Sequence, residues 1–124
     1  MNKRITKVTT KTGDKGTTGM ANGTRISKAD PVIVSIGEID ELNSLIGYLS
    51  SQQSAKKYKD TLNRIQNCLF DIGGSLSLGT IDSLDEDEIV FIEREIENLN
   101  NQLPELENFI LPGGDSSASI AQYT

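Results

Sequence analysis

Three stretches of the sequence carry apolar residues at helical spacing, and this pattern constrains the fold more than any other feature. In each stretch the apolar positions recur at steps of three or four, which places them on one face of an α-helix. The first set is Val32, Ile36, Ile39, Leu42, Ile46 and Leu49. The second is Tyr58, Leu62, Ile65, Leu69, Ile72 and Leu76, and the third is Ile89, Ile92, Ile96, Leu99 and Leu103. Because each apolar face needs another helix against it, we expect an all-α fold, an antiparallel helical bundle.

Capping residues mark where these helices begin. Asp30 followed by Pro31 predicts the first helix, because a carboxylate accepts from the unpaired backbone N–H groups and proline suits the first helical position. Asp85 predicts the start of the third helix, with Glu88 as its capping-box partner, and Pro104 is expected to end that helix.

A further helix begins near the end of the sequence. Its expected cap is Asp115 or Ser116, and the sequence reaches Thr124 without a C-cap glycine. We therefore expect about three full helices and the start of a fourth. Such a bundle would be incomplete, or completed by another chain.

Composition bounds the domain count and excludes several functions. The 124 residues suit one domain, 1–124, with a Gly/Thr-rich loop over 1–30 and the helical bundle over 31–124. With 12 Lys+Arg against 18 Asp+Glu, the net charge is −6, so we expect no nucleic-acid partner and no membrane surface. Histidine is absent, which excludes Ser-His-Asp and Cys-His catalysis. No stretch approaches the roughly 18 apolar residues of a membrane span. A single cysteine, Cys68, excludes an intramolecular disulfide and suits the cytoplasm.

The densest chemical signal is TKTGDKGTTG, residues 10–19. Its three glycines let a ligand approach the backbone, and its four threonine hydroxyls can donate to phosphate oxygens. Lys11 and Lys15 add positive charge, and Arg25 and Lys28 follow within the same loop. Asp14 could hold a magnesium ion that bridges phosphates. The stretch is not a P-loop, because it contains no GxxxxGK[ST]. A phosphate-binding loop and a flexible N-terminal tail both remain open at this point.

Two further motifs have open interpretations. In EIDELNSLIG, residues 38–47, helical spacing places Asp40, Asn43 and Gly47 on one narrow face, which is either a functional polar stripe or a solvated surface. In FILPGG, residues 109–114, three large apolar residues precede a sharp turn, which either plugs one end of the bundle or forms an apolar wall for a bulky ligand. For Cys68 we expect inert packing.

Taken together and in this order, the motifs resemble the PduO-type cob(I)alamin adenosyltransferases. The matching strings are TKTGDKGTTG, ISKADP (26–31), GEIDELNSLIG (37–47), IQNCLFDIGGSL (65–76) and LPELENFILPGG (103–114). The family transfers the 5′-deoxyadenosyl group of ATP to the cobalt of a reduced corrinoid, cob(I)alamin, giving adenosylcobalamin and triphosphate. The resemblance implies a five-helix bundle that forms a homotrimer with active sites at subunit interfaces. It also implies ATP as co-substrate, with magnesium.

The resemblance implies roles for individual residues as well. The implied ATP contacts are Thr10, Lys11, Thr12, Gly13, Asp14, Thr18, Gly19 and Lys28. Asp40 matches a catalytic carboxylate that pairs with an arginine of a later helix, and Asn43 would line the same cobalamin cavity. Phe109 matches the aromatic residue that stands beneath the corrin ring and displaces its lower axial ligand.

The sequence departs from the family pattern after its last helix begins. Family members continue through an arginine-rich stretch on the fourth helix and then through a fifth helix, and the sequence has no counterpart after Thr124. In the family those arginines bind triphosphate and pair with the carboxylate at Asp40. Two expectations therefore remain. One is an adenosyltransferase; the other is a catalytically inactive relative that binds ATP or corrinoid, or is purely structural.

Overall fold

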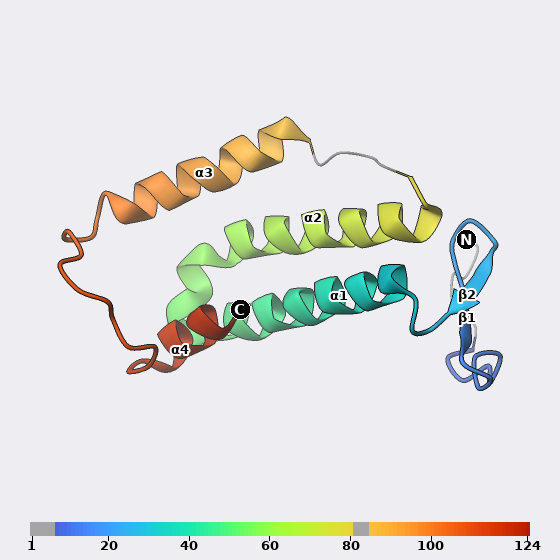
Figure 1. The fold of residues 1–124 in the computed structure, drawn as a ribbon. Helices are drawn as coiled ribbons and strands as arrows, with labels where there is room; N and C mark the ends of the chain where they lie inside the picture. The colour runs from blue at the N-terminus through green and yellow to red at the C-terminus, as the bar shows by residue number, and fades with distance from the viewer. Residues whose placement is uncertain (1–6, 81–84) are drawn as a thin grey trace.

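The computed structural model describes residues 7–80 and 85–124, and within them the fold is a helical bundle with a small N-terminal hairpin. The helices are α1 (Pro31–Ser50), α2 (Lys59–Leu78), α3 (Glu86–Asn100) and α4 (Ser116–Tyr123), with a 3-10 helix, η1 (Gln53–Tyr58), between α1 and α2. α1 and α2 lie side by side and antiparallel, and α2 lies between α1 and α3 (Figure 1). The all-α expectation is confirmed.

The predicted loop over 1–30 contains two short strands, β1 (Thr17–Gly19) and β2 (Arg25–Ser27). They pair antiparallel, with Thr18 opposite Ile26. A strand of three residues is too short to show apolar alternation, so no periodicity reveals it in the sequence. This hairpin stands at the end of the molecule where α1 begins and α2 ends (Figure 1).

α1 begins where its capping residues predict. Asp30 Oδ1 accepts from Val32 N at 2.9 Å, and Pro31 occupies the first turn. The predicted apolar residues of α1 and α2 are half-buried or buried, and α1 packs along α2. These two stripes therefore form the core, in which Ile46 is 5% exposed.

A reciprocal pair of hydrogen bonds fixes α1 against α2. Asn43 is 5% exposed, its Nδ2 donates to Gln66 O at 3.1 Å, and Gln66 Nε2 donates to Asn43 O at 3.0 Å. Gly47 leaves room for this contact, since a Cβ there would lie 3.2 Å from Gln66 Nε2. The solvated-surface interpretation is therefore wrong for Asn43, whereas Asp40 and Ser44 are exposed.

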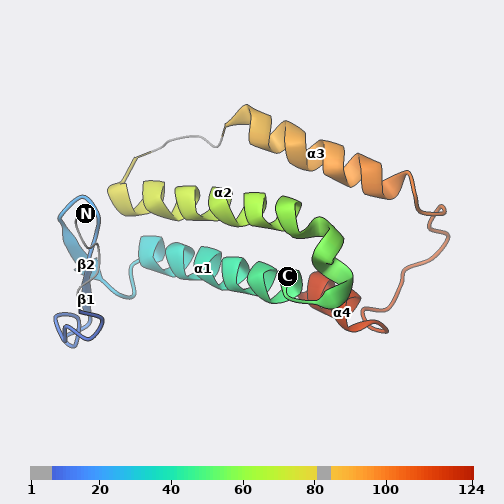
Figure 2. The same cartoon turned by 180° about the vertical axis from the view of Figure 1, so that it is seen from behind.

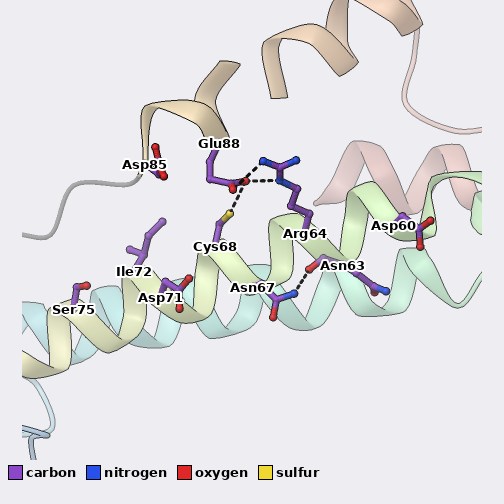
Figure 3. A pocket seen from close by; sticks show the side chains of 10 residues that line it. All are labelled: Asp60, Asn63, Arg64, Asn67, Cys68, Asp71, Ile72, Ser75, Asp85 and Glu88. Atoms are coloured by element: carbon purple, nitrogen blue, oxygen red, sulfur yellow. Dashed lines mark hydrogen bonds and ion pairs between the residues drawn. The ribbon is translucent and has the colours of Figure 1, made fainter. Parts of the chain in front are cut away.

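α3 contacts α2 through polar side chains (Figure 3). Arg64 Nε donates to Glu88 Oε2 at 2.6 Å and Arg64 Nη2 donates to Glu88 Oε1 at 2.9 Å, while the guanidinium lies 3.9 Å from the Phe91 ring centroid. The expected capping box is therefore wrong, because the Glu88 carboxylate turns to Arg64 instead of its own helix terminus. Asp85 does cap α3 by accepting from Asp87 N.

The carboxylate of Glu88 that binds Arg64 also accepts a hydrogen bond from the single cysteine, Cys68. The hydrogen bond from Arg64 lowers the pKa of Glu88, and Cys68 Sγ donates to Glu88 Oε2 at 3.4 Å. Burial, followed by the hydrogen bond to Glu88, raises the pKa of the Cys68 thiol. A thiol whose pKa is raised stays protonated, which agrees with the expectation of an inert residue.

The apolar face of α3 is not covered by the described residues. Ile96 is 61% exposed and Ile89 is 48% exposed, and apolar side chains of α2, α3 and α4 line an open groove of about 540 Å³. α3 also ends at Asn100 rather than at Pro104, and Leu103 lies beyond the helix and is 66% exposed. The expectation that Leu103 belongs to a helical core face is therefore wrong.

α4 begins at Asp115, one of its two expected caps. Asp115 Oδ1 accepts from Ser117 N at 2.8 Å and from Ala118 N at 3.2 Å. The helix packs beside the C-terminal part of α1, as both views show (Figure 2). Within residues 7–80 and 85–124, none of the helices combines the length and hydropathy that crossing a bilayer requires.

We predict that Asn43→Ala destabilises the fold by about 1–3 kcal/mol, because it removes one partner of a buried hydrogen-bond pair and leaves Gln66 O without its donor. Urea unfolding followed by circular dichroism measures the change. Ser44→Ala, one residue along on the exposed side of α1, is the matched control and should shift the midpoint little. Equal midpoints for Asn43→Ala and wild type would contradict the assigned role.

Candidate functional site

All eight implied ATP contacts line one cavity on the N-terminal segment. The cavity measures about 380 Å³. Its wall consists of Val8, Thr9, Thr10, Lys11, Thr12, Gly13, Asp14, Thr17, Thr18, Gly19, Arg25 and Lys28. We call it the loop cavity. Because the described part of this segment forms turns and a hairpin, the tail interpretation is wrong for it.

Tight backbone turns shape the loop cavity. Gly16 N donates to Gly13 O at 3.1 Å, and Lys28 N donates to Gly16 O at 2.9 Å. Lys11 has φ of +58°, in the left-handed region that few non-glycine residues adopt. Such a conformation persists only when the surrounding contacts support it.

Arg25 supplies one such support. Its Nη2 donates to Thr12 O at 2.8 Å, to Thr17 O at 3.2 Å and to Thr17 Oγ1 at 3.0 Å. The loop is therefore connected across the cavity by a side chain as well as by its backbone turns.

The loop cavity is locally basic in an acidic chain. Its wall carries three cations, Lys11, Arg25 and Lys28, against one carboxylate, Asp14, whereas the whole chain has a net charge of −6. Lys28 lies directly against Gly13, where an added Cβ would come 3.0 Å from both Cε and Nζ of the lysine. Glycine thus permits the ammonium group to reach the cavity. The arrangement favours an anion with several oxygens.

A second cavity, of about 540 Å³, adjoins the first between the hairpin, α1 and α2. The two cavities share Thr18, Gly19 and Lys28, and Asp40 and Asn43 also line the second one. Its apolar wall consists of Met20, Ile33, Ile36, Ile39, Leu69 and Phe70. Among the described residues, no cation lies within ion-pair distance of the Asp40 carboxylate.

Two residues that help to build this region were not identified from the sequence. Ala21 N donates to Ser77 O at 3.1 Å and to Ser77 Oγ at 3.0 Å, which attaches the hairpin to the end of α2. Ser77 carries no sequence signal, because its partner is a backbone group 56 positions away. Phe70 lines the second cavity and is 67% exposed. Its place next to the apolar stripe, rather than within it, is a signal that could have identified it.

Phe109 does not lie with these residues. It belongs to the segment between α3 and α4, which lies at the end of α1 opposite the hairpin (Figure 2). Its side chain is fully exposed, and Ile110 and Leu111 are 77% and 88% exposed, so the plug interpretation of this segment is wrong. The 20 residues of α1 correspond to about 30 Å. One chain therefore places its loop cavity and its Phe109 at opposite ends.

The metal-binding expectation concerns one carboxylate. Within the described residues, no group of three or more His, Cys, Asp or Glu side chains is arranged to hold a metal ion. Asp14 stands among threonine hydroxyls in the loop cavity. This donor set suits a magnesium ion whose remaining ligands are phosphate oxygens and water.

Comparison with known proteins assigns the family. The sequence pattern of the family described as cobalamin adenosyltransferase matches residues 8–124. The chain belongs to this family. A cobalamin adenosyltransferase of Cupriavidus metallidurans is 40% identical over 98% of the chain, and a corrinoid adenosyltransferase of Bacillus subtilis is 43% identical over 92% of it. The chain covers 66% and 62% of these two relatives, slightly less than two thirds of their lengths.

Solved structures of the family have the same fold. A variant of the PduO-type ATP:corrinoid adenosyltransferase from Lactobacillus reuteri, complexed with ATP, has a TM-score of 0.85 and 36% identity, and the match covers 94% of this chain and 69% of that one. Another variant of that enzyme, complexed with cobalamin and ATP, has a TM-score of 0.86 and 34% identity, covering 94% and 67%. The helical bundle seen here is thus the adenosyltransferase bundle.

We predict that Gly13→Ala weakens the binding of inorganic triphosphate by roughly five- to tenfold, because the new Cβ displaces the Lys28 ammonium group from the loop cavity. Isothermal titration calorimetry measures the affinity. Gly74→Ala is the matched control, since its Cβ in α2 would meet no heavy atom within 4 Å. Unchanged affinity in Gly13→Ala would show that the position of Lys28 does not matter for the anion.

Proposed function

We propose that the chain carries the nucleotide-binding and part of the corrinoid-binding machinery of an ATP:cob(I)alamin adenosyltransferase. The reaction transfers the 5′-deoxyadenosyl group of ATP to the cobalt of cob(I)alamin and releases triphosphate. One observation carries the proposal. The eight residues that the family resemblance implies as ATP contacts, seven from residues 10–19 together with Lys28, line one basic cavity in an acidic chain.

The loop cavity would bind the triphosphate. Lys11 and Lys28 supply positive charge, and the threonine hydroxyls and backbone N–H groups of residues 10–18 supply hydrogen-bond donors. Asp14 would hold magnesium against the phosphate oxygens. Neutralising the triphosphate stabilises the leaving group as its negative charge develops.

The chemistry requires no general base. Cob(I)alamin is itself the nucleophile: the cobalt electron pair forms a Co–C bond with the ribose C5′, and the C5′–O bond breaks as its electrons leave with triphosphate. The protein has to align cobalt with C5′ and to exclude water. The absence of histidine from the chain is consistent with this requirement.

Asp40 and Asn43 would act from the second cavity, which adjoins the loop cavity. Asn43 is held rigidly by Gln66, whereas the exposed Asp40 carboxylate has no cationic partner among the described residues. An arginine from outside the described residues would suit Asp40, as the family resemblance implies. Such a pair would fix one wall of the cavity beside the nucleotide.

Phe109 leads to the proposal of a homotrimer. Its exposed ring suits the lower face of a corrin, where an apolar wall excludes water and makes reduction to Co(I) easier. Because one chain places the ring and the loop cavity at opposite ends, we propose that they meet between neighbouring copies. We also propose that the reaction takes place in the cytoplasm, because its reducing conditions suit a chain with one cysteine.

The alternative is a relative that binds ATP or corrinoid without turnover. The observation that favours it is the Asp40 carboxylate, which has no cationic partner among the described residues. Binding and catalysis therefore need separate measurements.

We expect adenosylcobalamin to form when the chain, joined to the C-terminal third of the Bacillus subtilis relative, receives ATP, magnesium and chemically reduced cobalamin without oxygen. The loss of Co(I) absorbance follows the reaction. Lys28→Met should lower kcat/KM by tenfold or more, because it removes a positive charge that stabilises the leaving triphosphate. Lys15→Met removes the same charge from a residue outside both cavities and is the control. Ligand binding without any turnover would support the alternative instead.

Mixing two variants tests the arrangement between copies. Both variants are made in the joined chain of the preceding experiment. We expect Lys28→Met and Phe109→Ala each to form almost no adenosylcobalamin when expressed alone. When they are co-expressed in equal amounts, about a quarter of the interfacial sites should combine an intact loop with an intact Phe109, and activity should return to that level. No recovery in the mixture would show that both residues act from the same copy.

A further inference from the structure

Arg25 differs from the other two cations of the loop cavity in what its side chain contacts. Its Nη2 donates to three acceptors of the loop itself, at 2.8–3.2 Å. The ammonium groups of Lys11 and Lys28 have no ion-pair partner among residues 7–80 and 85–124. The two lysine ammonium groups are therefore available to an anion, whereas Nη2 of Arg25 already binds the protein.

The acceptors of Arg25 come from the two sides of the loop. Thr12 precedes the turn at Gly13, and Thr17 begins β1. Arg25 itself stands on β2 opposite Gly19, and a Cβ added at Gly19 would lie 3.8 Å from its Nη1. One side chain thus ties both sides of the loop to the strand pair.

The bond from Arg25 to Thr12 O lies beside the one non-glycine residue with a positive φ among the described residues. Lys11, whose φ is +58°, directly precedes Thr12, so fixing the Thr12 carbonyl restrains the peptide groups that follow the left-handed residue. All three bonds come from one nitrogen, Nη2, and the lysine ammonium nitrogen lies one bond closer to its Cα than Nη2 of arginine does, so it would fall short of these acceptors. Lysine at this position could keep the charge but could not reproduce the bridge.

We propose that Arg25 is a positioning residue for triphosphate: it holds residues 12–17 in the shape in which Lys11, Lys28 and the threonine hydroxyls meet the phosphate groups. A loop held in its binding shape loses less conformational entropy when the anion binds. This inference rests on the proposed function, because it takes the loop cavity as the triphosphate site. It assigns Arg25 an effect through the loop rather than through its own charge.

The test compares Arg25→Lys, Arg25→Met and the control Lys15→Met in the 124-residue chain. We expect both Arg25 variants to weaken the binding of inorganic triphosphate about tenfold, and the control less than about twofold, since one hydrogen-bonded guanidinium is lost only in the first two. Calorimetric titration gives the affinities. Amide hydrogen exchange gives a readout without ligand, and it should accelerate over residues 12–18 in both Arg25 variants. The thermal midpoint should stay close to that of wild type, because the hairpin lies outside the α1–α2 core.

The outcomes separate the inference from the proposed function. Wild-type affinity in Arg25→Lys, with loss in Arg25→Met, would overturn the inference in favour of a direct charge contact with phosphate. Unchanged exchange over residues 12–18 in Arg25→Met would overturn it as well. If the wild-type chain bound neither triphosphate nor ATP, the proposed function would fail. The exchange data would then still decide whether Arg25 holds the loop.

Discussion

The position of the candidate site depends on the hydrogen-bonded pair between Asn43 and Gln66. Each side chain bonds to the other residue's backbone carbonyl inside the α1–α2 interface, so the two helices cannot slide without breaking both bonds. That register decides which residues of α1 stand beside the end of α2. Since Ser77 at that end holds Ala21 of the hairpin, the same register sets where the loop cavity lies relative to Asp40.

Electrostatics then gives the region its chemical character. The chain as a whole is acidic, and an acidic surface repels polyanions. The loop cavity reverses the sign locally by bringing Lys11, Arg25 and Lys28 around one carboxylate. Of these three cations, Arg25 stabilises the loop itself, and the two lysines face the cavity without such contacts. A small number of charges can thus give an anion site to a chain of opposite net charge.

Local signals were sufficient for much of the fold. Asp30 and Pro31 mark the start of α1 because capping depends on adjacent residues. The stripe from Leu62 to Leu76 predicts the half-buried face of α2 because helical periodicity is local, whereas Tyr58 lies in η1. Glu88 shows where such reasoning fails. Its spacing from Asp85 suits a capping box, but Arg64 on another helix binds its carboxylate more closely. Phe109 is a second case, because the motif FILPGG does not reveal how far its aromatic ring lies from the loop cavity in one chain.

The sequence by itself determined the class of fold and the family, since these follow from periodicity and motif order along the chain. Only the tertiary structure decided that eight loop residues share one cavity, that Asn43 serves the core while Asp40 stays exposed, and that Phe109 lies at the far end of α1. It also decided that Arg25, which lines the cavity, binds the loop through Nη2. The physical reason is that none of these outcomes follows from adjacent residues alone: turns and strand pairing within residues 8–28 form the loop cavity, and helix packing sets the positions of Asn43 and Phe109.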